Sequence, residues 1–87
     1  MELIEWLEQG RQLVANHINK KARIPVKPKE VFVVWFSKTL QNKKALFGYP
    51  KTKQYFELTA NEEKGKQLLD VYCKDENIEF DLEDEQC

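Results

Sequence analysis

The sequence predicts an α+β fold in the order α-β-β-β-α, with two helices packed on a three-stranded antiparallel meander. Three observations predict it. Residues 2–20 carry apolar side chains at helical spacing, residues 30–60 hold three short apolar runs separated by polar turns, and residues 61–76 begin with a helix-capping sequence. The chain has 87 residues, of which 41% are apolar, so we expect a single small domain over residues 1–87.

The first helix is predicted from an amphipathic pattern in residues 2–20. At about 100° per residue, its apolar side chains fall on one broad arc. These side chains are Leu3, Ile4, Trp6, Leu7, Leu13, Val14 and Ile18. Gly10 lies within the same arc, although a glycine inside a helix costs about 1 kcal/mol relative to alanine. We therefore expect the helix backbone to pass close to the sheet at Gly10.

The first strand is expected at residues 30–40. It begins with six consecutive apolar residues, from Val31 to Phe36. A run of β-branched and aromatic side chains without polar alternation is typical of a central strand that is covered on both faces. A polar turn at Leu40–Lys44 follows and makes the strand the first half of a hairpin.

The second and third strands are expected at residues 44–49 and 54–59, separated by a proline-containing turn. Side chains alternate between the two faces of a strand. In the third strand this alternation places Phe56 and Leu58 toward the core, with their neighbours facing away.

A second helix is predicted at residues 61–76. Asn61 can serve as its N-cap, and Glu62 and Glu63 in the first turn suit the helix dipole. Beyond this helix, apolar and acidic residues alternate, which predicts a short fourth strand as an addition to the meander. The alternating residues are Ile78, Glu79, Phe80, Asp81, Leu82 and Glu83. We expect residues 83–87 to form an acidic tail.

Residue usage argues against an enzyme or a metal protein. His17 is the only histidine, three glycines are too few for a nucleotide-binding loop, and no Ser-His-Asp arrangement is present. The two cysteines, Cys73 and Cys87, are too few for a zinc site. We therefore predict no catalytic activity, no cofactor and no metal. No apolar run approaches the ~20 residues that cross a bilayer, and the N-terminus is acidic, so we expect a soluble cytoplasmic protein without a membrane partner.

Charge is distributed unevenly along the chain. Residues 19–53 contain ten Lys or Arg and one acid, whereas residues 54–87 contain three Lys and eleven acids. The basic segment 20–53, with aromatic residues among its lysines, predicts phosphate contacts and base stacking if the aromatics are exposed. The acidic end can imitate a nucleic-acid backbone on a partner, solubilise the chain, or fold against the basic segment. An uncovered sheet face would instead favour a homo-oligomer.

Part of the first hairpin resembles a known family. Segments Val34-Trp35, Lys38-Thr39-Leu40-Gln41-Asn42 and Lys44-Ala45-Leu46 are similar to an uncharacterised family of small proteins encoded by phages and prophages of Gram-positive bacteria. The Lys-Thr-Leu-Gln-Asn segment is the most specific part. The resemblance implies a phage accessory or host-interaction protein in the bacterial cytoplasm, with no assigned catalytic residues.

The sequence therefore predicts a small non-enzymatic protein that acts by protein–protein interaction, of a host-interaction or anti-defence type, with nucleic-acid binding as the alternative. The candidate contact residues lie in the first hairpin and the acidic end. They are Trp35, Lys38, Thr39, Gln41, Asn42, Lys43, Lys44, Glu79, Asp81 and Glu83. The turn also has a structural interpretation, in which Asn42 adopts the left-handed conformation and Thr39 pairs across the strands.

Overall fold

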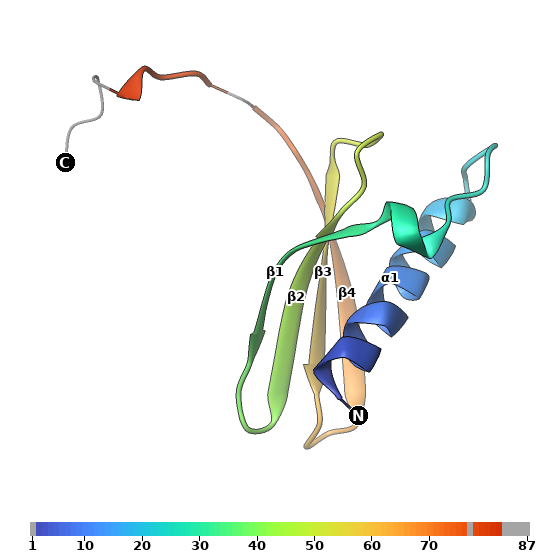
Figure 1. Cartoon of the computed structure of the whole chain (residues 1–87), viewed down its shortest axis with the longest axis vertical. Coiled ribbons are helices and arrows are strands. Elements are labelled where there is room, and N and C mark those ends of the chain that lie inside the picture. The colour runs from blue at the N-terminus through green and yellow to red at the C-terminus, as the bar shows by residue number, and fades with distance from the viewer. Residues whose placement is uncertain (1, 77, 83–87) are drawn as a thin grey trace.

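One helix and a four-stranded antiparallel sheet make up the fold (Figure 1). The computed structural model describes residues 2–76 and 78–82. Helix α1 (Leu3–Asn19) is followed by a 3₁₀ turn, η1 (Pro28–Glu30), and by four strands whose order in space is their order in sequence. The strands are β1 (Phe32–Lys38), β2 (Asn42–Gly48), β3 (Gln54–Asn61) and β4 (Lys66–Cys73).

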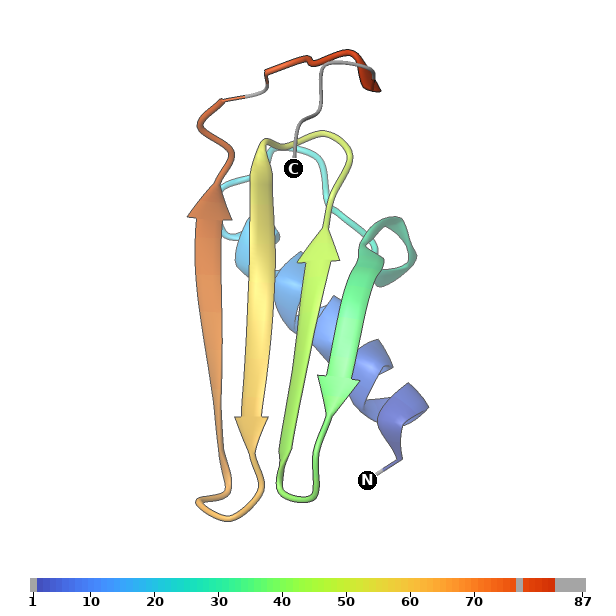
Figure 2. The same cartoon turned by 90° about the vertical axis from the view of Figure 1, so that its left-hand side faces the viewer.

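The core lies between α1 and one face of the sheet. Alternate residues of the two central strands point into it, as expected for Phe56 and Leu58, which are both buried. Helix α1 passes behind the sheet in Figure 2 and leaves the opposite face toward the viewer. The buried apolar residues are Trp6, Val14, Ala15, Val26, Val31, Ala45, Phe47, Phe56, Leu58 and Ala60.

Helix α1 lies close against the sheet at Gly10. A methyl group on Gly10 would lie 2.5 Å from Cζ of Phe47 and 3.2 Å from Cδ2 of Leu58. Such distances are shorter than van der Waals contact, so only glycine lets the helix backbone approach this far. The predicted close approach at Gly10 is confirmed.

The connection between α1 and β1 is fixed by one asparagine. The Asn19 amide donates to the Val26 carbonyl at 3.1 Å, and the Val26 backbone N–H donates to Asn19 Oδ1 at 2.6 Å. This reciprocal pair holds Val26 in the core, where it is 5% exposed. A loop that carries basic residues is therefore anchored at both ends.

The predicted second helix at residues 61–76 is wrong, and the α-β-β-β-α order is wrong with it. The segment forms strand β4 instead, so the sheet has four strands and the chain has a helix only at its N-terminal end among the described residues. Asn61 does cap a turn, because its Oδ1 accepts a hydrogen bond from Lys64 N at 3.2 Å. Gly65 then turns the chain back with a φ of 63°, a conformation that ends any helix.

The short strand expected at residues 78–83 is also not found in its described part, residues 78–82. None of these five residues lies in a strand. They continue beyond β4 on the side of the sheet away from α1 (Figure 1). The strand that completes the sheet is Lys66–Cys73, which pairs antiparallel with β3 over its whole length.

Strand β1 lies at the edge of the sheet, so its predicted central position is wrong. Its apolar run does not reflect burial on both faces. Val31 lies in the core, whereas Phe32, Trp35 and Phe36 are 42–51% exposed. The register of β1 against β2 shifts between Val33 and Trp35, which marks a bulge. Bulges are common on edge strands, where they disfavour pairing with another chain.

Candidate binding surface on the sheet

The face of the sheet away from α1 is a candidate binding surface, and we call it the open face. Residues that pair directly across antiparallel strands share a face. Starting from Tyr55, Glu57 and Thr59, which alternate with the buried residues of β3, the register identifies the other members. The open face comprises Phe32, Trp35, Ser37, Asn42, Lys44, Leu46, Gly48, Tyr55, Glu57, Thr59, Asn61, Lys66, Leu68, Asp70 and Tyr72.

The open face exposes large apolar side chains. Trp35 is 42% exposed, Leu68 67% and Tyr72 50%, and these residues come from opposite edges of the sheet. In Figure 2 no helix or strand of the described residues lies over this face. Exposed aromatic side chains are enriched at the binding surfaces of proteins.

A charged group lies at the centre of the open face. Tyr72 donates its hydroxyl to Glu57 Oε1 at 3.2 Å, and Lys44 Nζ lies 3.9 Å from the same oxygen. The negative charge of Glu57 raises the pKa of Tyr72, because an ionised phenol beside a carboxylate is unfavourable, and the hydrogen bond to Glu57 adds to this shift. The centre of the face is therefore polar, with apolar residues around it.

One end of the open face is hollowed into a groove of about 880 Å³. Trp35 and Leu68 contribute apolar side chains to it, and Lys44, Lys64 and Lys66 contribute positive charge. No acidic side chain is among the described residues that line it. The groove lies at the end of the sheet where the β1–β2 and β3–β4 turns are found, and the turn residues Thr39 and Asn42 also line it.

The β1–β2 turn is held by a compact set of hydrogen bonds. The Asn42 carbonyl accepts from the Thr39 backbone N–H at 2.8 Å and from the Thr39 hydroxyl at 3.3 Å. Asn42 does not have a positive φ, so the interpretation that it occupies the left-handed conformation is wrong. Gln41 accepts a hydrogen bond from Glu62 N at 2.9 Å, which joins the two turns that border the groove.

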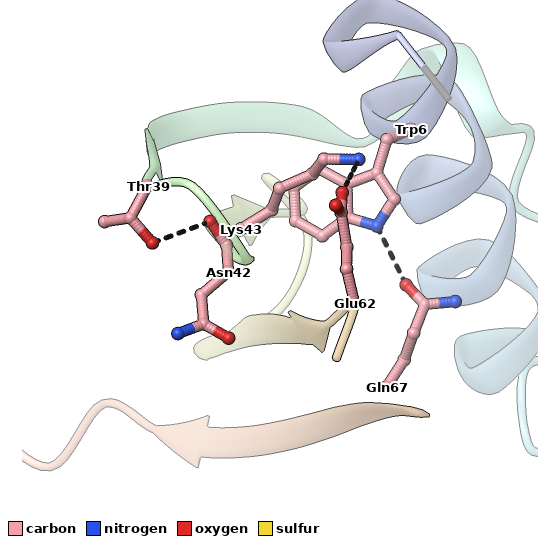
Figure 3. A network of polar contacts seen from close by, with 6 residues as sticks. All are labelled: Trp6, Thr39, Asn42, Lys43, Glu62 and Gln67. Carbon is pink, nitrogen blue, oxygen red and sulfur yellow. Dashed lines mark hydrogen bonds and ion pairs between the residues drawn. The ribbon is translucent and has the colours of Figure 1, made fainter. Parts of the chain in front are cut away.

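Lys43 is directed away from the open face. Its ammonium lies 2.7 Å from Glu62 Oε1 and 5.8 Å from the ring centroid of Trp6, and its side chain is only 4% exposed (Figure 3). Trp6 in turn donates its indole N–H to Gln67 Oε1 at 2.8 Å. The hydrogen bond and the positive charge of Lys43 lower the pKa of Glu62. These contacts connect the first part of α1 to the first residues of β2 and β4.

The other candidate residues are distributed over the molecule. Lys38 and Gln41 are exposed at the β1–β2 turn. Glu79 and Asp81 are exposed in the segment beyond β4, at the opposite end of the sheet from the groove (Figure 2). Glu83 and the predicted acidic tail lie outside the described residues.

The basic segment 20–53 does not gather into one patch. Lys38 and Lys44 lie at the end of the sheet that contains the groove, whereas the turn with Lys51 and Lys53 lies at the opposite end. The last turn of α1, which leads into Lys20, is also at that opposite end (Figure 1). The length of the strands separates the two groups of cations.

Sequence analysis missed the part of the open face that β4 contributes, and one lysine of the groove. The predicted helix at residues 61–76 includes Lys66, Leu68 and Tyr72 of the open face and Lys64 of the groove. The turn ending in Gly65 was the signal for a strand, because the apolar residues after it are too few to distinguish a strand from a helix.

The part of the chain that the structure describes holds no cluster of three or more His, Cys, Asp or Glu placed to bind a metal ion. Within the same residues, no helix has the length and apolar content needed to cross a membrane.

The curated proteins and the solved structures that were compared with the chain include no match. A family model does match: it is described as a family of unknown function, DUF6275, and it covers residues 7–82. The matched region runs from α1 through all four strands and into the segment beyond β4. The chain, with its open sheet face, therefore belongs to this family of unknown function.

Proposed function

We propose that the protein is a non-enzymatic binding module that contacts a partner protein through the open face. The observation that carries this proposal is the uncovered sheet, with Trp35, Leu68 and Tyr72 exposed on the side away from α1. Aromatic residues supply much of the binding energy at protein interfaces, where they become fully desolvated. A rigid sheet presents such residues without the entropic cost of ordering a loop.

The charge of the open face favours a protein over a nucleic acid. Glu57 and Asp70 lie side by side on β3 and β4, at the middle of the face, and would repel a phosphate backbone. The lysines of the open face, Lys44 and Lys66, lie at its groove end, and the remaining cations of the basic segment do not form one patch with them. A partner protein can match such a mixed surface, because the two sides of a protein interface pair apolar side chains with each other and place opposite charges against one another.

The setting of this interaction is also part of the proposal. The similarity of the Lys38–Asn42 and Lys44–Leu46 segments to proteins of phages and prophages supports a phage accessory role. We propose that the protein acts in the cytoplasm of a bacterial host, on a host or phage protein.

Affinity capture from a bacterial lysate at low salt tests the proposed function. The immobilised wild type is compared with a Trp35→Ser, Leu68→Ser variant of the open face. The matched control is Ile4→Ser, Ile24→Ser, which also removes two exposed apolar side chains but lies on α1 and the following loop. A protein retained by the wild type and the control, and lost from the open-face variant, supports the proposal. Capture that is equal for all three proteins, or no capture, contradicts it.

Nucleic-acid binding is tested separately by fluorescence anisotropy with duplex and single-stranded DNA and RNA at two salt concentrations. We expect no binding. Phosphate contacts would give an affinity that falls steeply with salt, and such a result would favour the basic segment 20–53 as the functional surface.

A further inference from the structure

We infer that residues 78–82 of a second copy of this chain occupy the groove at the end of the open face, so that two copies bind each other by exchanging these segments. The inference deepens the proposed function and rests on it, because it takes the open face as a protein-binding surface and names its occupant.

The segment has apolar side chains without a cover. Ile78 is 59% exposed, Phe80 76% and Leu82 90%, and none of them packs on the core of its own chain. Their spacing of two residues places all three on one side of an extended chain. Such a side could lie against the apolar part of the groove formed by Trp35 and Leu68.

The charges of the segment and the groove are complementary. Glu79 and Asp81 alternate with the three apolar residues, and residues 75–82 contain no cation. Lys44, Lys64 and Lys66 line the groove, and no acidic side chain does so among its described residues. An extended segment that buries its apolar side directs the two carboxylates away from the floor of the groove, and the long lysine side chains at the edge of the groove can reach them there.

Chain length disfavours occupation of the groove by the segment of the same chain. The Lys74 backbone N–H donates to the Lys53 carbonyl at 2.6 Å, so the chain still follows β3 after the end of β4 and leads away from the groove. The residues from Asp75 to Leu82 can span at most ~27 Å when fully extended. Strand β4 alone is about 26 Å long, so the segment would have to reverse at once and remain fully stretched.

A two-fold arrangement removes this difficulty. The segment extends from the sheet on the side of the open face, at the end opposite the groove (Figures 1 and 2). When two open faces meet across a two-fold axis that lies parallel to the sheet and perpendicular to its strands, the second copy is reversed end to end, and each segment reaches the groove end of the other copy. Such an interface is self-complementary, as a closed dimer requires.

Sedimentation equilibrium of the full chain tests the inference. The buffer is reducing, because the exposed Cys73 could otherwise join two chains by a disulfide. We expect a concentration-dependent dimer. Lys64→Glu with Lys66→Glu should weaken it by at least about tenfold, and Phe80→Ser with Leu82→Ser should do the same. The matched control, Lys51→Glu with Lys53→Glu, makes the same charge change at the other end of the sheet and should leave the dimer intact.

Two recombinations identify the occupant. Mixing the Lys64→Glu, Lys66→Glu chain with the Phe80→Ser, Leu82→Ser chain should restore a hetero-pair, because one chain keeps the segment and the other keeps the groove. Adding Glu79→Lys and Asp81→Lys to the Lys64→Glu, Lys66→Glu chain should restore its own dimer. A monomeric wild type, or a dimer that neither pair of substitutions weakens, overturns the inference.

The two proposals fail in different ways. If the wild type is monomeric and the Trp35→Ser, Leu68→Ser variant still loses a captured partner, only the second-copy inference is wrong. If the open-face variant changes neither self-association nor capture, the proposed function is wrong as well.

Discussion

Two glycines of this protein each meet an aromatic ring where another residue would place a side chain. At Gly10 the ring is Phe47, below α1 in the core; at Gly48 it is Phe32, whose Cζ lies 2.5 Å from the position of a Cβ atom. Phe32 and Gly48 are partners across β1 and β2 on the open face. The ring of Phe32 therefore covers the backbone of β2 at Gly48, where β2 has no side chain.

Gly10→Ala should destabilise the protein. Alanine improves helix propensity by about 1 kcal/mol, but its methyl group would lie 2.5 Å from Phe47 Cζ and 3.0 Å from Cε2. Overpacking of this kind costs about 1–3 kcal/mol, and Phe47 is fully buried and has no space to move. Urea unfolding measures the change, with the exposed Gln9→Ala as control. A gain in the free energy of unfolding would show that α1 shifts easily.

Lys43→Met should raise the pKa of Glu62 toward its ordinary value, because the hydrogen bond and charge of Lys43 lower that pKa. A carboxyl group with a lowered pKa in the folded state stabilises the protein above its unfolded pKa, and this contribution is lost as pH falls through the folded pKa. The wild type should therefore lose more stability than the variant on acidification through and below the ordinary glutamate range. NMR titration of Glu62 and unfolding at several pH values measure both effects, and equal pH dependence in the two proteins would contradict the role of the pair.

At the scale of elements, the sequence predicted α1 and the first three strands to within a few residues, because each has a single clear period or a distinct turn beside it. Strand β4 was missed. Asn61 followed by two glutamates has the chemistry of a helix N-terminus, and the apolar residues Leu68, Leu69 and Val71 are too few to distinguish the two periods. The decisive residue is Gly65, whose positive φ lets the chain reverse its direction between β3 and β4.

The candidate site was predicted in part for the same reason. The β1–β2 turn and Trp35 were identified from the sequence, and the structure places Trp35, Thr39, Asn42 and Lys44 around one groove. The other wall of this groove belongs to β4. Because the sequence predicted a helix at residues 61–76, these residues were not expected to extend the sheet. The direction of Lys43 depends on its register opposite Ala60, and a single sequence contains no such information.

Gly65→Ala should destabilise the β3–β4 hairpin by about 1–3 kcal/mol, since an alanine at positive φ is strained. Nothing lies within 4 Å of a Cβ atom at this position, so the loss would come from the backbone alone. Gly65→Asn should lose less, because asparagine tolerates the left-handed conformation. Thermal unfolding of both variants and of a Lys64→Ala control measures this. Equal stability of the alanine and asparagine variants would contradict a conformational origin.

At the scale of the whole molecule, the protein has two layers and two unlike sheet faces. Trp6 belongs to α1 and is 3% exposed, whereas Trp35 lies on the open face and is 42% exposed. The two tryptophans therefore report on opposite sides of the sheet. Any partner on the open face, including a second copy, changes the surroundings of Trp35 and leaves Trp6 unaffected.

Acrylamide quenching should accordingly resolve two classes of tryptophan in dilute protein. Trp35→Phe should remove the accessible class and Trp6→Phe the protected one, since only Trp35 is reached by solvent. In the wild type the accessible class should become protected as the protein concentration rises, because the open face becomes covered. The Lys64→Glu, Lys66→Glu variant serves as control and should remain quenchable at every concentration. Quenching of Trp35 that is independent of concentration in both proteins would mean that the open face does not bind a second copy. Protection of Trp35 at every dilution would mean that a segment of its own chain covers the face.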